Sequence, residues 1–395
     1  MGILFPGFIL LLLFGGFLLL ERRRLARLRA RVPLRICVTG TRGKSAVTRQ
    51  VAAALRASGR AVLAKTTGSK PVLIFPDGRE REIDRPGPAS VLEQKRVLAL
   101  AARLGVDALV AEMMSIRPEC LAVESDLILR PGLLAVTNVR LDHEEEMGRT
   151  REEIAESLAA AIPGGGTVLV PEGEIFPAFA RTAREKNARL VSVPRSEEDG
   201  PLPLVDFPEN VRLSLAVAER AGIDRPTASR GIASAEPDFG DLRAWSVVSP
   251  ASGRTWHFVS IFAANEPEST RIALERARRR VSFEGRKAIA LLNLRADRAF
   301  RTRRWLEALR DGFFAGFDRV VFIGEQAPAL GRLKLPRSAG IPAIGALAGR
   351  SPAKVTNALW SMSAGEAVVT GVGNIAGLGG ALVEYWDAAG TRIPC

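Results

Sequence analysis

The chain has 395 residues, of which 47% are hydrophobic, and a formal net charge of +13. This length exceeds one typical domain and predicts two or three, and the hydrophobic share is enough for buried cores. A strongly basic chain makes nucleic acid the first suspect as a partner. The sequence has one tyrosine and no recognisable nucleic-acid-binding motif, so aromatic stacking surfaces are scarce and we expect no nucleic acid partner.

The chain starts with an apolar segment. Residues Ile3–Leu20 carry no charge over eighteen positions, about the minimum for a membrane-spanning helix. Seven arginines follow it closely, whereas a secretory signal carries its positive charge in front of the apolar core. We therefore predict an uncleaved transmembrane anchor over residues 1–20 and a basic juxtamembrane linker over residues 21–34 that contacts anionic lipid. The positive-inside rule then predicts a single-pass protein of the cell membrane, with the remaining chain cytoplasmic.

A glycine-rich turn follows the first predicted strand, in the stretch "RICVTGTRGKSAVTRQVAAAL" over residues 35–55. The usual P-loop pattern would need glycine at position 38, where this chain has Val38. The other physical requirements of a phosphate site are met, because glycines let backbone N–H groups turn inward and a helix N-terminus attracts anions. The alternative is an ordinary turn between a strand and a helix. The candidate phosphate-binding residues are Gly40, Thr41, Arg42, Gly43, Lys44 and Ser45, of which Ser45 could also ligate Mg²⁺.

Strand-like and helix-like stretches alternate after this turn, which predicts a mainly parallel sheet with helices on its faces. The stretch Ala61–Lys65 reads as a strand, and residues 91–105 read as an amphipathic helix. The next strand, Ala108–Ala111, delivers Glu112 to a strand end. Ligands of open α/β sheets lie beyond the carboxyl ends of strands, so this carboxylate can meet a metal ion held by the glycine turn. The alternative is an acidic residue that caps a turn.

A polar loop follows the next predicted strand, Leu133–Val136, and contains Asn138, Asp142 and His143. A neutral imidazole can bind a metal while a neighbouring carboxylate fixes its tautomer, so His143 is a candidate metal ligand. The alternative is a solvated surface loop. The capping box "TREE" then starts a helix over residues 151–161.

A second arginine-rich tract runs from Arg271 to Arg310, around the strand-like "KAIALLNL". Arg295, Arg298 and Arg301 follow this strand, so we expect them at a strand end where ligand contacts occur. The tract could guide a polyanionic substrate or contact nucleotide phosphate, or it could be a set of solvated helix faces. The late stretch "TGVGNIAGLGG" is read as a turn between the last strand and helix, because too few residues remain for a dinucleotide-binding unit.

In order and spacing, "TGTRGKS", "AEMMS" and "TNVRLDH" resemble the ATPase core of the Mur ligase superfamily, whose short glycine loop lacks a glycine at the position of Val38. This resemblance implies ATP and Mg²⁺ as cofactors. It implies that Lys44 contacts the β- and γ-phosphates, that Ser45 and Glu112 hold one Mg²⁺, and that His143 helps to hold a second. It also implies nucleotide contacts by Asn210, at the start of "ENVRLSLAVAERAGI", and by Arg243, in "PDFGDLRAW".

Two departures from the pattern of the cell-wall Mur ligases indicate the branch of the superfamily that this chain resembles. Only about fourteen residues separate the apolar segment from the first strand, which leaves no room for the N-terminal domain of cell-wall Mur ligases. The family's metal-binding carbamylated lysine is also missing, since no lysine lies between His143 and Pro163. With "SIRPE", "FAAN" and "TGVGNIAGLG" in addition, the chain resembles the ligase subunit of poly-γ-glutamate synthase, the PgsB/CapB family.

This second resemblance implies an ATP-dependent amide ligase of capsule synthesis. It would activate a glutamate γ-carboxylate as an acyl phosphate, join it to an amino group of the growing poly-γ-glutamate, and work with small membrane proteins of the same synthesis and export system. The fold implied is α/β, with a Mur ligase central-domain-like, P-loop-type ATP-binding domain over residues 35–238 and a smaller α/β C-terminal domain over residues 239–395. The alternative function is a P-loop ATPase or small-molecule kinase coupled to membrane transport, and a third possibility is a membrane-tethered scaffold that binds nucleotide without turnover.

Overall fold

The chain divides into two compact units, Met1–Asp238 and Phe239–Cys395. The computed structural model describes residues 4–68, 70–85, 87, 89–142, 144–195, 207–250, 252–296, 299–330, 343–347, 349 and 351–393. Two of the predicted site residues, His143 and Arg298, lie outside these ranges.

The first unit is built on an eight-stranded sheet in the order β4-β3-β2-β5-β1-β6-β7-β8. The six strands from β2 to β8 in this order run parallel. At one edge, β3 pairs antiparallel with β2, and β4 pairs antiparallel with β3. Strands β2, β5 and β6 are buried along their whole length, as expected for apolar parallel strands covered on both faces. The strands are β1 (Leu34–Thr39), β2 (Val62–Lys65), β3 (Val72–Ile74), β4 (Glu80–Glu82), β5 (Ala108–Glu112), β6 (Leu133–Val136), β7 (Thr167–Pro171) and β8 (Arg189–Val193).

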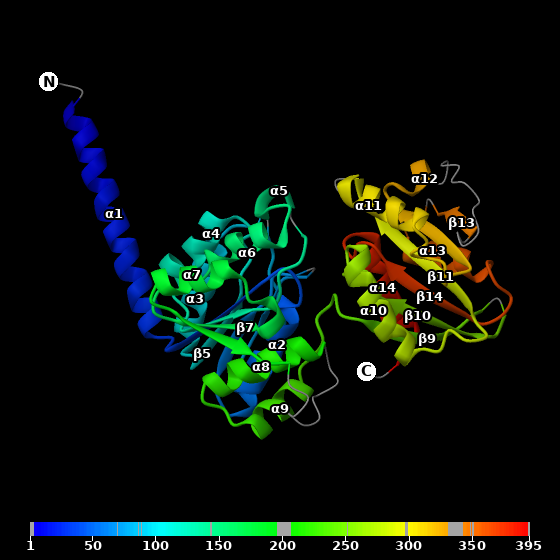
Figure 1. Ribbon diagram of the computed structural model, residues 1–395, viewed down its shortest axis with the longest axis horizontal. Coiled ribbons are helices and arrows are strands. Elements are labelled where there is room, and N and C mark those ends of the chain that lie inside the picture. Colours follow the sequence, from blue (N-terminus) through cyan, green and yellow to red (C-terminus); the bar gives the residue numbers. More distant parts are fainter. Residues whose placement is uncertain are drawn as a thin grey trace. The chain divides into compact units, whose positions relative to one another are not determined.

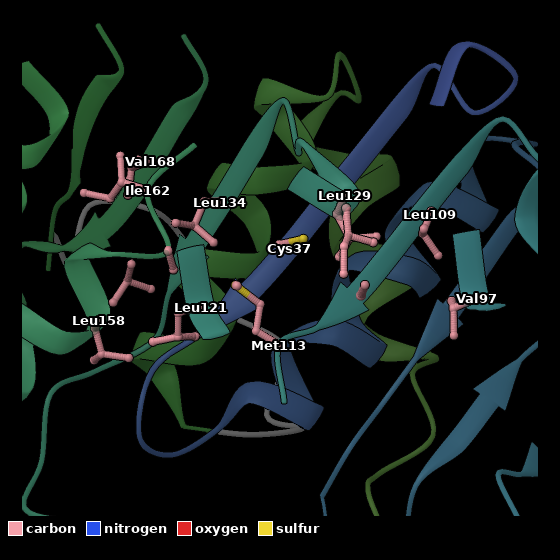
Figure 2. Packing of buried hydrophobic residues seen from close by; sticks show 14 of the residues in the cluster. Cys37, Val97, Leu109, Met113, Leu121, Leu129, Leu134, Leu158, Ile162 and Val168 are labelled. Atoms are coloured by element: carbon pink, nitrogen blue, oxygen red, sulfur yellow. The ribbon is translucent and has the colours of Figure 1, made fainter. Parts of the chain in front are cut away.

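Helices cover both faces of this sheet (Figure 1). One hydrophobic core contains side chains of α1, α3, α4, α6 and α7, and the other contains side chains of α2, α8 and α9. Figure 2 shows part of the first core, including Cys37, Leu129 and Leu134, which come from three different elements. The helical segments are α1 (Leu4–Ala30), α2 (Lys44–Ala57), α3 (Glu93–Leu104), α4 (Pro118–Ala122), the π-helix η1 (Val123–Leu129), α5 (Glu144–Met147), α6 (Arg151–Ala159), the 3-10 helix η2 (Glu172–Glu174), α7 (Pro177–Glu185), α8 (Pro208–Arg220) and α9 (Arg225–Ala233).

The N-terminal helix α1 corrects the membrane prediction. Within the described part of the chain, no helix combines the length and the apolar character that crossing a bilayer requires. Helix α1 has 27 residues, but its charge-free part ends at Leu20 and the helix continues through Glu21 and a run of arginines. The predictions of a transmembrane helix and of a single-pass membrane localisation are therefore wrong.

The second half of α1 packs on the first unit instead. Leu25 is 7% exposed and belongs to its core, and Glu21 accepts a hydrogen bond from Lys95 of α3 at 2.7 Å. Arg29, one of the arginines expected to face lipid, donates to the Leu127 carbonyl at 2.8 Å, and Arg35 of β1 donates to the Leu129 carbonyl at 2.8 Å. The contact of residues 21–34 with anionic lipid stays a prediction.

The second unit is built on a seven-stranded sheet in the order β13-β12-β11-β14-β10-β9-β15. The strands from β13 to β10 in this order are parallel. Strand β9 pairs antiparallel with β10 on one side and with β15 on the other. One core contains side chains of α10, α11 and α12, and the other contains those of α13 and α14. The elements are β9 (Arg243–Val248), β10 (Thr255–Ser260), α10 (Pro267–Arg280), β11 (Lys287–Leu294), α11 (Ala299–Arg310), β12 (Arg319–Gly324), α12 (Ala327–Leu330), β13 (Ala343–Ala346), α13 (Pro352–Trp360), β14 (Ala367–Val372), α14 (Leu378–Ala389) and β15 (Thr391–Arg392).

The α/β class predicted from the sequence is confirmed, and so are several individual elements. Strand β6 has the predicted bounds, and the glycine turn joins β1 to α2. Helix α6 begins with the predicted capping box, in which Thr150 and Glu153 bond reciprocally, although it ends two residues before the predicted end. The glycine-rich stretch near the C-terminus is the turn between β14 and α14, as predicted.

Candidate nucleotide and metal site

The glycine turn between β1 and α2 has a backbone that needs both of its glycines. Gly40 has φ 125° and Gly43 has φ 78°, values that side chains with a Cβ rarely adopt. A Cβ on Gly40 would lie 2.1 Å from Thr137 Oγ1, and a Cβ on Gly43 would lie 2.7 Å from Asn210 Nδ2. The turn is therefore closely packed between the polar segment after β6 and the first turn of α8.

Asn138, in the segment after β6, fixes the shape of this turn. Its Oδ1 accepts hydrogen bonds from Thr41 Oγ1 at 2.7 Å and from the Arg42 N–H at 3.1 Å, and its Nδ2 donates to the Arg42 carbonyl at 3.0 Å. The Thr41 N–H also donates to the Asn138 carbonyl at 3.1 Å. The sequence placed Asn138 in this loop but gave it no role. Its position after the strand next to β1 is the signal that could have indicated one.

Lys44, at the start of α2, folds back over the turn. Its Nζ donates to the Gly40 carbonyl at 2.8 Å and to the Thr41 carbonyl at 3.3 Å. Burial lowers the pKa of Lys44, and the carboxylates of Glu112 and Asp142 oppose that shift. The ammonium group therefore lies inside the turn, where it can meet a phosphate that binds the same backbone.

Ser45 and Glu112 form the second part of the site. The Ser45 hydroxyl donates to Glu112 Oε2 at 2.7 Å, and the Thr67 N–H donates to the same oxygen at 2.7 Å. Glu112 is 2% exposed, at the carboxyl end of β5, where the sequence predicted it. Among the described residues, both of its side-chain hydrogen bonds use Oε2, which leaves Oε1 open to another partner.

These two oxygen ligands fit a small divalent cation. Mg²⁺ prefers hard oxygen ligands and usually binds one or two protein side chains together with substrate phosphates and waters. Within the described ranges, no group of three or more His, Cys, Asp and Glu side chains could hold a metal ion by itself. Phosphate oxygens and waters would therefore complete the coordination shell of a cation bound by Ser45 and Glu112.

The segment after β2 also reaches this site, and the sequence analysis missed it. A Cβ on Gly68 would lie 2.7 Å from Ser45 Oγ and 3.4 Å from Asp238 Oδ2. Asp238 in turn accepts from Arg49 Nε at 3.2 Å, one turn beyond Ser45 on α2. A glycine three residues after β2, the strand that neighbours β5, is the signal that could have identified this contact.

The remaining predicted residues fall in both units. Asn210 is 5% exposed in the first turn of α8 and packs against Gly43, so the first unit brings it together with the glycine turn. Arg243 begins β9 of the second unit, where its guanidinium lies 5.6 Å from the centre of the Phe239 ring. Arg295 follows β11 and Arg301 lies on α11, both also in the second unit. The roles of these four residues stay predictions.

Comparison with known proteins identifies the family. The chain matches the Mur ligase middle domain over residues 38–211 and the "Poly-gamma-glutamate synthase CapB C-terminal domain" over residues 247–389. It is 31% identical over 374 residues to PGA synthase CapB of Bacillus subtilis (strain 168), covering 93% of each chain. It is 32% identical over 300 residues to the capsule biosynthesis protein CapB of Bacillus anthracis, covering 74% of this chain and 64% of that one.

Solved structures share the fold at lower identity. E.coli FolC in complex with ADP is 20% identical with a TM-score of 0.64, covering 93% of each chain. The bifunctional folylpolyglutamate synthase/dihydrofolate synthase of Yersinia pestis is 18% identical with a TM-score of 0.63, covering 93% of this chain and 92% of that one. These structures show the fold, whereas the 31% identity to PGA synthase CapB over 93% of each chain and the two family matches confirm the resemblance: the chain belongs to the CapB family of poly-γ-glutamate synthases and is an ATP-dependent ligase.

Proposed function

We propose that this ligase builds poly-γ-glutamate by activating a glutamate γ-carboxylate with ATP. A carboxylate oxygen attacks the γ-phosphorus of ATP, ADP leaves, and an acyl phosphate forms. An α-amine then attacks the acyl carbon, phosphate leaves, and the amine nitrogen loses a proton as the amide forms. The observation that supports this proposal is the closely packed turn of Gly40 to Ser45 beside Glu112, in a chain that is 31% identical to a PGA synthase.

The proposed nucleotide site lies in the first unit. The N–H groups of Thr41 and Arg42 bind Asn138, so the backbone N–H groups proposed to face the phosphates are those of residues 43–45 at the start of α2, since helix N-termini and inward-turned amides bind anions. Lys44 adds a positive charge, and its present hydrogen bonds to the Gly40 and Thr41 carbonyls show that its Nζ reaches the turn. Asn210, in the first turn of α8, is proposed to contact the nucleotide, and Arg243, at the start of β9, is proposed to contact phosphate.

We assign Ser45 and Glu112 as ligands of Mg²⁺, with His143 helping to hold a second ion. A related protein, the bifunctional folylpolyglutamate synthase/dihydrofolate synthase of Yersinia pestis, has been solved with AMPPNP and a Mn ion. A divalent cation at this position supplies charge neutralisation for phosphoryl transfer, which depends chiefly on positioning and electrostatics. The side chains of this protein do the positioning, since Ser45 and Glu112 already hold each other at 2.7 Å.

The acceptor is proposed to bind through the second unit. Arg295, Arg298 and Arg301 would attract glutamate and the growing polymer, which carries one carboxylate per residue. Within the same tract, Arg271 lies 5.7 Å from the centre of the Phe313 ring, and Arg303 donates to Glu307 at 3.0 Å. We also propose that the ligase works with small membrane proteins of the same synthesis and export system.

The substitution Lys44→Ala tests the proposed function. Wild type should release ADP in a glutamate-dependent manner when given ATP, Mg²⁺ and glutamate, and polymer should accumulate. Lys44→Ala should keep its far-UV circular dichroism and its melting temperature within a few degrees, because Lys44 is the first residue of α2 and is only partly buried, outside the hydrophobic core. ADP release should nevertheless fall by about a hundredfold or more. The exposed Lys354→Ala on α13 is the matched control.

Two results would contradict the proposal. ADP release that does not depend on glutamate, with no polymer, would indicate an ATPase or a kinase for another substrate. Near-normal ADP release by Lys44→Ala would show that the glycine turn does not hold the phosphates.

A further inference from the structure

A fully buried carboxylate lies behind the strand end that carries Glu112. Glu124 is 0% exposed and belongs to η1, a seven-residue π-helix that directly follows α4. π-helical turns are rare and often mark functional sites. No residue of the proposed nucleotide or metal site is part of η1, so the proposed function does not account for this carboxylate.

Glu124 binds the turn that follows β5. Its Oε1 accepts from the Ser115 N–H at 3.1 Å and from Ser115 Oγ at 2.6 Å, and its Oε2 accepts from the Met114 N–H at 3.3 Å. Met114 and Ser115 are the second and third residues after Glu112 in the chain. One buried side chain therefore fixes the backbone directly after the proposed metal ligand.

Gln94 of α3 extends this network to Glu112 itself. Its Nε2 donates to the Glu112 carbonyl at 3.1 Å and to Glu124 Oε2 at 3.3 Å. The Glu112 carbonyl is thus held by Gln94, which also binds Glu124, while the Glu112 carboxylate is held by Ser45 and Thr67.

A buried cation balances the charge of this region. Lys65, at the end of β2, is 0% exposed, and its Nζ lies 2.8 Å from Glu93 Oε1 and 3.5 Å from Met114 Sδ. Burial raises the pKa of Glu124, and the hydrogen bond from Ser115 and the positive charge of Lys65 oppose that shift. The same ammonium group helps to lower the pKa of Glu93. Lys65 also precedes Thr67 by two residues, so it anchors the strand end from which Thr67 donates to Glu112.

Stability alone is a poor explanation for this network. Replacing buried ion pairs by well-packed apolar residues is often neutral or stabilising, because each buried charge loses its hydration. A carboxylate at position 124 gives instead a defined direction to three donors of one turn. In metal sites, such outer partners orient the ligands, and their substitution typically costs 10- to 100-fold in metal affinity.

We propose that Glu124 is a positioning residue, which holds the turn after β5 so that the Glu112 carboxylate faces Ser45 and a divalent cation. Lys65 and Gln94 support it from the neighbouring elements. This inference rests on the proposed role of Glu112 as a metal ligand.

The substitution Glu124→Gln tests the proposal, because it keeps the shape of the side chain but removes the charge and turns one acceptor into a donor. We would measure ADP binding by calorimetry with Mn²⁺ and again in excess EDTA. The Mn²⁺-dependent gain in ADP affinity should fall about tenfold or more, while metal-free ADP affinity should stay within about twofold of wild type. Asp126→Asn is the matched control, since Asp126 lies in the same π-helix and pairs with Lys186 at 2.7 Å, away from the turn.

Two further variants make every outcome decisive. Ser115→Ala removes one donor to Glu124 and should reduce the Mn²⁺-dependent gain by a smaller factor in the same direction, even if Glu124→Gln does not fold. Glu112→Gln should abolish that gain. If Glu112→Gln has no effect, the proposed metal site is wrong. If Glu112→Gln abolishes the gain but Glu124→Gln and Ser115→Ala leave it at the wild-type value, or lower metal-free affinity equally, the positioning role of Glu124 is wrong.

Discussion

Gly40 illustrates how a single residue decides whether the phosphate turn can form. Its φ of 125° is rarely adopted by residues with a side chain, and the space where a Cβ would lie is already filled by Thr137 Oγ1 at 2.1 Å. Gly59, at the end of α2, also has a positive φ, 85°, but a Cβ there would meet nothing within 4 Å. Comparing alanine substitutions at Gly40 and Gly59 therefore distinguishes the cost of steric overlap from the cost of backbone strain.

We predict that Gly40→Ala lowers the free energy of unfolding by about 3 kcal/mol or more, since strain and overlap each cost about 1–3 kcal/mol. Gly59→Ala should cost only about 1 kcal/mol, because it adds strain alone. Urea unfolding of both variants checks the difference. Equal losses would show that the segment after β6 gives way to the added methyl group. ADP affinity should fall in Gly40→Ala and stay unchanged in Gly59→Ala.

At the scale of elements, a buried ion pair ties β2 to α3. Glu93, in the first turn of α3, accepts from Lys65 and binds Arg85 through both of its oxygens, at 2.8 and 2.9 Å. Burial alone would raise the pKa of Glu93, but these hydrogen bonds outweigh it and hold the pKa at about 2, below its ordinary value of 4.5. Burial lowers the pKa of Lys65 although Glu93 opposes that shift. Keeping Lys65 charged therefore offsets part of the stability that the depressed pKa of Glu93 contributes.

The pH dependence of unfolding follows from the direction of the Glu93 shift. A carboxyl with a depressed folded pKa contributes stability that is fully present above its unfolded pKa of about 4.5 and is lost as pH falls toward 2. Between pH 4.5 and 3.5, wild type should therefore lose about 1 kcal/mol more than Glu93→Gln. Urea unfolding at pH 6, 4.5 and 3.5 measures this. A constant difference between the two proteins over that range would mean that the ion pair contributes no depressed pKa.

At the scale of the whole molecule, the arginine excess dominates the electrostatics. The net charge is +13, and helix α10 alone carries Arg278, Arg279 and Arg280 in its last turn. Such a field attracts polyanions and raises their rate of association, and salt weakens it because the Debye length falls to about 10 Å at 0.1 M. The question for the proposed acceptor site is whether the position of an arginine matters beyond its charge.

We predict that Arg301→Glu raises the apparent KM for the acceptor several-fold or shortens the polymer, while leaving ATP affinity nearly unchanged. Arg303→Glu is the matched control, since it changes the net charge equally and Arg303 is 80% exposed on the same helix. The effect of Arg301→Glu should shrink between 20 and 200 mM salt. Equal effects of both variants would assign the tract to a general field, and lost ATP binding in Arg301→Glu would assign it to phosphate contacts.

Local patterns made part of this protein predictable from the sequence. The glycine turn, the strand ending at Glu112 and the capping box of α6 depend on residues that are close in the chain, and their physical preferences act within a few positions. The motif order predicted the family, which the comparisons confirm. Asn210, predicted as a nucleotide contact, is placed against the glycine turn, although its role stays to be tested.

The N-terminal segment shows the limit of composition as a guide. Its apolar residues predicted a membrane anchor, but α1 continues past Leu20, and Glu21 and Leu25 are bound to the first unit. A hydropathy average reports the composition of a segment, whereas the folded chain shows where the helix ends and which residues it packs against.

Contacts between distant segments were decided by the tertiary structure alone. The sheet order places β1 between β5 and β6, and this order brings Asn138 onto the glycine turn and Glu112 onto Ser45. The sequence did not predict a role for Glu124, because its hydrogen bonds to Ser115 form only when η1 packs against the segment after β5. The sequence by itself determined which residues can do chemistry and which local structures carry them. Strand order and buried hydrogen bonds decided which of them meet, because these depend on segments far apart in the chain.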